Sequence, residues 1–147
     1  MSYQLPALRQ IERGADRLRL SAPSGKRSSE REENMVYVIH KDELPHSETA
    51  HRFEGHLNGD AGVSFFLIDS ERGGGPDLHT HPYAEVFVVQ EGTVTFTAGE
   101  KTIEAGAGQI VVVPPGVPHK YVNSGTGRTR HVDIHASGSM ETEWLEP

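Results

Sequence analysis

The chain has 147 residues, contains no cysteine and carries a formal net charge of −7. This length suits one domain with its own core, and the missing thiols exclude disulfides, cysteine nucleophiles and thiolate metal ligands. The acidic balance argues against nucleic acid as a partner. No apolar run approaches the roughly 20 residues of a membrane span, and the N-terminus lacks the apolar stretch of a signal peptide. We therefore expect a cytoplasmic protein without a membrane partner.

Residues 1–34 differ in composition from the rest of the chain. They hold seven basic and five acidic residues, a net charge of +2, which leaves −9 for the remaining 113 residues. We therefore predict a weakly ordered N-terminal extension over residues 1–34 and one folded domain over residues 35–147. A Ser-, Gly- and charge-rich linker is expected over residues 21–34. Apolar residues at near-helical spacing predict one short amphipathic helix before it: Leu5, Leu8, Ile11, Ala15 and Leu18.

Three interpretations of this extension stay open. The first is an arm that packs on a partner subunit. The second is a targeting segment, although five acidic residues count against a transit peptide. The third is sequence ahead of a mis-set start codon, with Met35 opening the native domain.

From Met35 onward the pattern is typical of β-structure. The stretch 93–98 alternates threonine with apolar residues, the period-2 signature of a half-buried strand. Turn residues recur every 8–12 positions, which favours a β-sandwich or barrel. The predicted strands are 35–40, 52–56, 63–69, 85–90, 93–98, 101–105, 109–113, 119–123 and 130–135.

The residues that carry chemistry are three histidines and a carboxylate. His79 and His81 share one face of a strand, because side chains alternate along it. The turn at 82–84 can bring Glu85 to the same pocket, and a Pro- and Gly-rich approach delivers His119 from another strand. Three imidazoles and one carboxylate are a plausible set of ligands for a transition metal.

Two extended motifs resemble those of the cupins. The first joins a glycine to His-X-His, Glu and a second glycine, here Gly73, His79, His81, Glu85 and Gly92. The second joins a glycine to Pro-X-Gly, His and Asn, here Gly108, Pro114, Gly116, His119 and Asn123. Every marked position is filled. Fifteen residues separate Gly92 from Gly108, close to the loop between the motifs of small single-domain cupins.

The resemblance implies an all-β fold, a double-stranded β-helix (jelly-roll) cupin barrel with an N-terminal extension. It suggests His79, His81, Glu85 and His119 as ligands of a divalent ion, with iron, manganese, nickel or zinc as candidates. Cupins commonly form homodimers. Four protein ligands on an octahedral ion leave two positions for water, substrate or dioxygen.

The function expected from this resemblance is a metal-dependent enzyme acting on a small organic molecule in the barrel mouth. Its chemistry would be dioxygenase-like, or isomerase- or lyase-like, with Glu85 as a candidate catalytic base. The alternative is a non-catalytic module that binds or senses a small molecule, and the residues do not decide whether the chain is an enzyme. A metal-independent sugar epimerase fits less well, because such an enzyme does not need all four ligand positions.

Several other residues are assigned by parity. Phe87 shares the inward parity of Glu85, and Tyr83 and Tyr121 are candidates for the pocket lining or for ordinary barrel packing. We expect His131, Asp133 and His135 on the solvent or dimer face, with the intervening Val132 and Ile134 in the core, although the three could instead orient a metal ligand. Gln90 is expected to point outward, and Trp144 and Leu145 to anchor the C-terminal tail. Scattered surface histidines are expected at His40, His46, His51 and His56.

Overall fold

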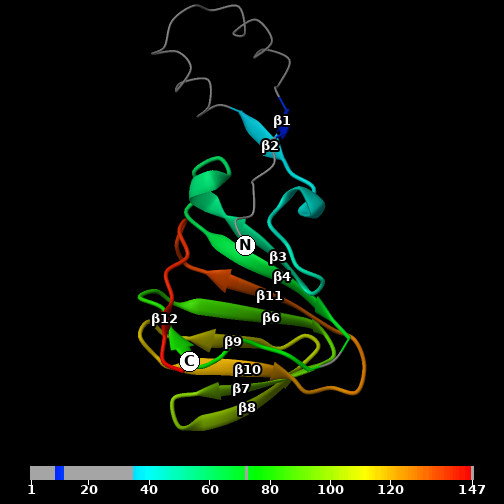
Figure 1. Cartoon of the computed structure of the whole chain (residues 1–147), viewed down its shortest axis with the longest axis vertical. Helices are drawn as coiled ribbons and strands as arrows, with labels where there is room; N and C mark the ends of the chain where they lie inside the picture. The colour runs from blue at the N-terminus through cyan, green and yellow to red at the C-terminus, as the bar shows by residue number, and fades with distance from the viewer. Residues whose placement is uncertain (1–8, 12–34, 72, 147) are drawn as a thin grey trace, which may run out of the picture.

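Two five-stranded antiparallel sheets face each other and form the barrel (Figure 1). The fold is seen in a computed structural model that describes residues 9–11, 35–71 and 73–146. The first sheet, here the β4 sheet, runs in the order β3 (Ala50–Glu54), β4 (Ser64–Ser70), β11 (Thr129–His135), β6 (Glu85–Glu91) and β9 (Ile110–Val113). The second, the β10 sheet, runs β12 (Glu143–Trp144), β5 (His79–Thr80), β10 (His119–Asn123), β7 (Thr93–Ala98) and β8 (Lys101–Gly106).

The order of the strands is that of a double-stranded β-helix. Apart from the pairs β3–β4 and β7–β8, strands of the barrel that follow one another in the chain pass from one sheet to the other, as β6 does to β7 and β9 to β10. Gly92 makes the first of these passages at φ 80°, where a Cβ atom would stand 2.6 Å from the carbonyl oxygen of Arg128. Each strand predicted from residue 52 onward is present, with ends shifted by at most two residues. The all-β prediction is confirmed, and the two 3-10 turns, η2 (Lys41–Glu43) and η3 (Gly55–Leu57), are short.

The N-terminal part of the described chain forms a separate two-stranded sheet. β1 (Arg9–Ile11) pairs antiparallel with β2 (Val36–Val38), with Gln10 opposite Tyr37. The helix predicted across this region is wrong at residues 9–11. A helix of this length is marginal without packing, whereas the strand gains hydrogen bonds from β2. The rest of the predicted helix and the linker at 21–34 lie outside the described residues, and the domain boundary at Met35 stays a prediction.

The apolar core lies between the two sheets. Phe87 and Val89 of β6 point into it from one sheet, and Phe96 and Tyr121 point into it from the other. The rings of Phe87 and Phe96 meet edge to face with centroids 4.7 Å apart, a favoured aromatic geometry. The predicted parity of β6 is therefore confirmed, including the exposed Gln90.

Strand β11 has the opposite parity to the one predicted. His131, Asp133 and His135 are buried, while Val132 and Ile134 lie on the outer side of the β4 sheet. The register explains the burial, because Asp133 stands opposite Phe87 and His135 opposite Glu85 on β6, both inward residues. Polar groups are tolerated there because each finds a partner inside the barrel.

Among the described residues, no helix has the length and apolar character needed to cross a membrane.

Candidate metal centre

Four residues from three strands and a turn meet at one end of the barrel. His79 on β5 stands directly opposite His119 on β10, His81 follows two residues later, and Glu85 begins β6. All four are buried, and each offers a ligand atom within 4.8 Å of the others. The structure therefore brings together the four residues selected from the sequence, although binding of a metal to them stays a prediction.

Backbone carbonyl oxygens fix the tautomer of all three histidines. The Nδ1 of His79 donates to Asp77 O at 2.6 Å, that of His81 to Glu141 O at 2.7 Å, and that of His119 to Val117 O at 2.9 Å. A carbonyl oxygen only accepts, so the proton of each neutral ring sits on Nδ1. The lone pair of each neutral ring is consequently on Nε2, the arrangement typical of metal-binding histidines.

Glu85 lies at the centre of the cluster. Its Oε2 atom is 2.7 Å from Nε2 of His119 and 3.0 Å from Nε2 of His81, and its Oε1 atom is 3.2 Å from Nε2 of His135. Burial raises the pKa of Glu85, but contacts with the three rings outweigh burial and hold that pKa well below its usual value. The carboxylate is therefore ionised and suited to a cation.

Two rings of the cluster have pKa values shifted in opposite directions. Burial lowers the pKa of His119, but its hydrogen bond to Glu85 outweighs burial, and the pKa is raised overall. Burial lowers the pKa of His79. Direct contact with the carboxylate thus separates His119 from His79.

The residues fit a divalent ion. Nε2 of His81 is buried without a well-aligned hydrogen bond although it points at the cluster. An orphaned nitrogen of this kind is costly unless something binds it. The Nε2 atoms of the three histidines and one ionised carboxylate form a mixed nitrogen and oxygen set that suits iron, manganese, nickel or zinc.

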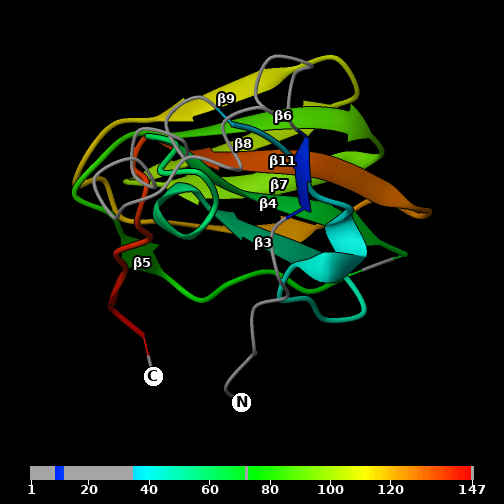
Figure 2. The same ribbon diagram turned by 90° about the horizontal axis from the view of Figure 1, so that it is seen from above.

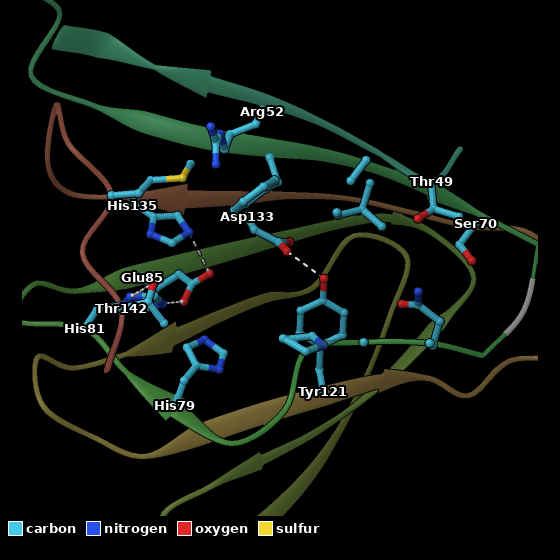
Figure 3. Close-up of a pocket in the computed structure, with 18 of the residues that line it drawn as sticks. Thr49, Arg52, Ser70, His79, His81, Glu85, Tyr121, Asp133, His135 and Thr142 are labelled. Atoms are coloured by element: carbon cyan, nitrogen blue, oxygen red, sulfur yellow. Dashed lines mark hydrogen bonds and ion pairs between the residues drawn. The ribbon is translucent and has the colours of Figure 1, made fainter. Parts of the chain in front are cut away.

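His135 is a fourth histidine of the site, and parity assigned it to the wrong face. Its Nδ1 atom lies 2.7 Å from the Tyr83 hydroxyl, which in turn accepts a hydrogen bond from the backbone nitrogen of Glu141 at 3.1 Å. Nε2 of His135 lies 3.2 Å from Glu85 Oε1 and, like Nε2 of His81, lacks a well-aligned hydrogen bond. His135 therefore lies beside Oε1 of the carboxylate (Figure 3), and Oε2 faces His81 and His119.

The cluster opens into a cavity of about 690 Å³. Of the three candidates for its lining, Tyr121 lies in the cavity wall, whereas Tyr83 and Phe87 do not. Phe87 is fully buried in the core behind Glu85, and the Tyr83 ring stacks on the far side of His81 with centroids 5.2 Å apart. Both aromatic residues support the cluster from outside the cavity. Phe87 packs in the core, and the Tyr83 hydroxyl contacts His135.

A second polar network occupies the cavity wall away from the cluster. The Tyr121 hydroxyl donates to Asp133 Oδ2 at 3.0 Å, and the other oxygen of Asp133 contacts Nδ1 of His131. Nε2 of His131 lies 3.0 Å from Oδ1 of Asn123. Burial raises the pKa of Asp133, an effect that the His131 contact opposes. The final asparagine of the second motif thus holds a buried His–Asp pair.

Two further segments close the cavity. Gly75, at φ 154°, lies so close to β10 that a Cβ atom there would stand 1.8 Å from the carbonyl oxygen of Tyr121. Opposite it, β12 pairs Trp144 with His79, and the two rings have centroids 5.1 Å apart. The tail is anchored as predicted, but by Leu145 and Glu146 bonding to Leu78 and by Lys120, while the Trp144 side chain stays 59% exposed.

The remaining histidines lie on or near the surface. His40, His46 and His56 are exposed, as predicted, whereas His51 is half-buried against Asp42 at 3.1 Å. Within the described part of the chain, the cluster around Glu85 is the one group whose donor atoms are close enough to share an ion.

Comparison with known proteins agrees with this geometry. Residues 66–135 match the family model described as "Cupin domain". These residues form a cupin domain. Its barrel resembles an oxalate decarboxylase from Lactobacillus farciminis, solved as a formate complex, with 18% identity and a TM-score of 0.63 over 76% of this chain and 36% of that one.

Other solved cupins agree in fold. An oxalate oxidase shares 20% identity and a TM-score of 0.59 over 74% of this chain and 63% of its own. An uncharacterised double-stranded β-helix protein from Klebsiella pneumoniae shares 21% identity and a TM-score of 0.57 over 75% and 97%. The chain thus spans about a third of the decarboxylase and under two thirds of the oxidase. No curated protein sequence matches the chain. At these identities the likeness establishes the fold alone.

Proposed function

We propose that this cupin domain is a metal-dependent enzyme that acts on a small organic acid beside an ion held by His79, His81, Glu85 and His119. The observation that carries the proposal is the shared tautomer of the three histidines, each with Nδ1 bonded to a backbone carbonyl. Such outer hydrogen bonds are characteristic of metal-ligating imidazoles. Histidines that serve only in packing would have no reason to direct the lone pairs of three Nε2 atoms toward one carboxylate.

Arg52 supports an acid as the substrate. It is the one lysine or arginine among the described residues that line the cavity, and it lies near His135 and Asp133 (Figure 3). Glu54 is 3.3 Å away and steadies the guanidinium without burying it, since 42% of the Arg52 side chain is exposed. Guanidinium groups bind carboxylates with two parallel hydrogen bonds. The structural relatives include an oxalate decarboxylase with formate and an oxalate oxidase with glycolate, both small carboxylates.

A bound divalent ion would supply Lewis-acid or oxygen-activating chemistry to such a substrate. Arg52 would orient the acid, and the apolar wall behind Glu85 would exclude water from that side. Glu85 is also the candidate general base, which would accept a proton from the substrate. Its Glu85→Gln variant tests this role, because loss of turnover with metal retained supports a base and unchanged turnover rules it out.

Elemental analysis tests the proposal directly. Protein purified without a histidine tag is expected to carry close to one equivalent of iron, manganese, nickel or zinc per chain. A His81→Ala/His119→Ala variant removes two ligand atoms and should lose the metal, whereas His56→Ala, an exposed histidine outside the cluster, should keep it. Wild-type protein that stays metal-free after reconstitution with each of these ions overturns the proposal.

One observation favours a second candidate, a module that binds a small molecule without transforming it. Both oxygens of Glu85 are already engaged by histidines, which leaves no idle base in the metal-free site. Calorimetry with small carboxylates, followed by a search for turnover of those that bind, separates the two. Tight binding without turnover by the metal-loaded protein would select the module.

A further inference from the structure

The cavity extends well beyond the metal centre. Inward residues of the β4 sheet, whose strands Figure 2 shows in order from β9 to β3, form rows about 6.7 Å apart, because alternate residues of a strand share a face. His135 stands opposite Ser64 in the row at the metal end, and Thr129 stands opposite Ser70 in the last row. These rows are six positions apart along β4, which is about 20 Å. Figure 3 shows His135 and Ser70 at opposite ends of the cavity that both residues line.

Among the described residues, charged side chains line one end of this cavity. Glu85 and His135 share the row at the metal end, and the next row carries Arg52, Phe66 and Asp133. The described residues that line the cavity beyond that row have no ionisable side chain. They are Thr49, Ala50, Ile68, Ser70, Asn123 and residues 73–75. A ligand can therefore place one charged group beside the metal centre, while its far part meets an uncharged surface.

The middle of the cavity wall is apolar. Ala50 and Ile68 stand opposite each other on β3 and β4, one row beyond Phe66. His131 completes this row on β11, but both of its ring nitrogens contact other side chains and the ring does not line the cavity. Methylene groups that leave water for such a wall gain binding free energy in proportion to the area buried. The wall therefore favours a ligand with an apolar body.

Neutral polar groups return at the far end of the cavity. Thr49 and Ser70 place their hydroxyls there (Figure 3), and Ser70 is 6% exposed. The backbone of Gly73 donates a hydrogen bond to Asn123 O at 2.9 Å, and Gly74 O accepts one from Asn123 N at 3.1 Å. The glycine segment is thus held at this end without adding side chains. A hydroxyl both donates and accepts, which suits a hydroxyl or carbonyl group of a ligand. A carboxylate placed here would meet no cation among the described lining residues, and an unpaired charge is costly.

We propose that the cavity binds an elongated monocarboxylic acid, with its carboxylate beside Arg52, an apolar body and an uncharged hydroxyl or carbonyl group at the far end. The position of the carboxylate rests on the proposed function. Ser70 lies four positions beyond Phe66, the partner of Arg52, which is about 13 Å along β4. An acid of about ten carbons with a terminal hydroxyl reaches about 12 Å, at about 1.2 Å per bond of an extended chain.

The volume of the cavity agrees with an acid of this size. Ligand pockets commonly enclose about 300–1,000 Å³, and this cavity measures about 690 Å³. The formate and glycolate found with the structural relatives are among the smallest carboxylic acids, so either would occupy the metal end alone. The part of the cavity lined by Ile68, Thr49, Ser70 and residues 73–75 is then what selects the substrate of this chain.

Calorimetry of the full chain with straight-chain acids from acetate to decanoate tests this assignment. The dissociation constant is expected to fall about threefold with each added methylene, because each one is buried against the apolar wall. Ile68→Trp fills the middle of the cavity, so it should weaken the binding of decanoate about 30-fold or more and leave that of acetate unchanged. Leu67→Trp, an equal enlargement at the neighbouring position on the outer side of β4, is the matched control and should bind both acids as the wild type does. Circular dichroism should show both variants folded.

Sebacate tests the far end, because it carries a second carboxylate in place of the terminal hydroxymethyl group of ω-hydroxydecanoate. It should bind at least about tenfold more weakly than ω-hydroxydecanoate. Wild-type affinity that is independent of chain length, equal binding of decanoate by the two tryptophan variants, or sebacate that binds as tightly as the hydroxy acid overturns the assignment. Metal content measured on the same samples tests the proposed function separately. Protein that holds its metal without a length dependence overturns the elongated acid alone, whereas metal-free protein with the length dependence supports the elongated acid and overturns the metal-dependent function.

Discussion

The two faces of the β4 sheet reverse the usual distribution of polarity. Its inner face carries Glu85, His135, Asp133 and Arg52, whereas its outer face carries aliphatic residues such as Val88, Val132 and Leu67. The alternation along each strand is equally regular on both sides. Alternation therefore predicts which residues share a face, but the groups that contact each face decide which of the two is turned inward. An inner face devoted to binding can be the more polar of the two.

The largest expected effect follows from breaking the inner network. Asp133 is 2% exposed and joins Tyr121 to His131. Asp133→Ala leaves both partners buried without an acceptor, so we expect a loss of about 3–5 kcal/mol in the free energy of unfolding. Chemical denaturation measures this. Ile134→Ala, the adjacent residue on the outer face, is the comparison, and a larger loss there at protein concentrations too low for pairing would contradict the contrast.

The next effect is stabilisation by metal. An ion present at 100 times its dissociation constant raises the free energy of unfolding by about 2.7 kcal/mol when it binds only the folded chain. Thermal unfolding with and without added manganese or iron measures the shift. His81→Ala should reduce it sharply, and Val88→Thr, on the outer side of β6, should leave it unchanged. An equal response in wild type and His81→Ala would remove His81 from the ligand set.

A smaller effect tests the outer face. A folded dimer that unfolds to separate chains gains about 1.4 kcal/mol from each tenfold rise in concentration. For a chain of this length, that corresponds to a rise in Tm of roughly 2–5 °C. Calorimetry of the wild type at two concentrations gives the shift, and Val112→Glu, on the exposed outer side of β9, should abolish it. A wild-type Tm that does not change with protein concentration would contradict the homodimer expected from the resemblance.

The smallest effect concerns pH in the metal-free protein. The pKa of Glu85 is lowered from its usual 4.5, so its contribution to stability is present above pH 4.5 and lost as pH falls through the folded value. The pKa of His119 is raised from 6.5, so its contribution is present below pH 6.5 and lost as pH rises through the folded value. Their ion pair should therefore stabilise the chain most between pH 4.5 and 6.5.

Thermal melts of metal-free wild type and Glu85→Gln across pH 4 to 9 test this window. The difference in Tm between the two proteins should be largest near pH 5–6 and should shrink at alkaline pH. A difference that grows toward pH 9 would contradict the assigned ion pair.

The sequence was sufficient for the strands and for the four candidate ligands. Period-2 alternation and turn residues located the barrel, and the spacing of His79, His81 and Glu85 indicated a shared pocket. The inward direction of Phe87 and Val89 followed from that pocket. These features are local, so short-range patterns were enough.

Contacts between segments that are distant in the sequence could not be predicted from these short-range patterns. The parity of β11 was misassigned because Val132 and Ile134 are more apolar than their neighbours, while the partners of His135 and Asp133 come from Tyr83, Glu85 and Tyr121 on other segments. One signal was available. His131, Asp133 and His135 alternate with two apolar residues. Ionisable residues at alternate positions of a strand are as typical of a polar cavity as of a solvent-exposed face.

The way in which the C-terminal tail is anchored and the strand at residues 9–11 were both missed for the same physical reason. Leu145 was expected to anchor the tail by burial, but its backbone nitrogen does so by bonding to Leu78. Residues 9–11 were expected in a helix, but pairing with β2 makes them a strand. Backbone pairing of this kind depends on which strand edge is nearby, and composition carries little trace of it.

The carbonyl oxygen of Glu141 has a consequence for the order in which the protein matures. It fixes the proton of His81, and the backbone nitrogen of the same residue holds Tyr83. All four candidate ligands are translated at least twenty residues earlier, between positions 79 and 119. During synthesis the imidazole of His81 is therefore present before the segment that selects its tautomer. Metal loading should be a late event, completed only when the tail has closed over the barrel.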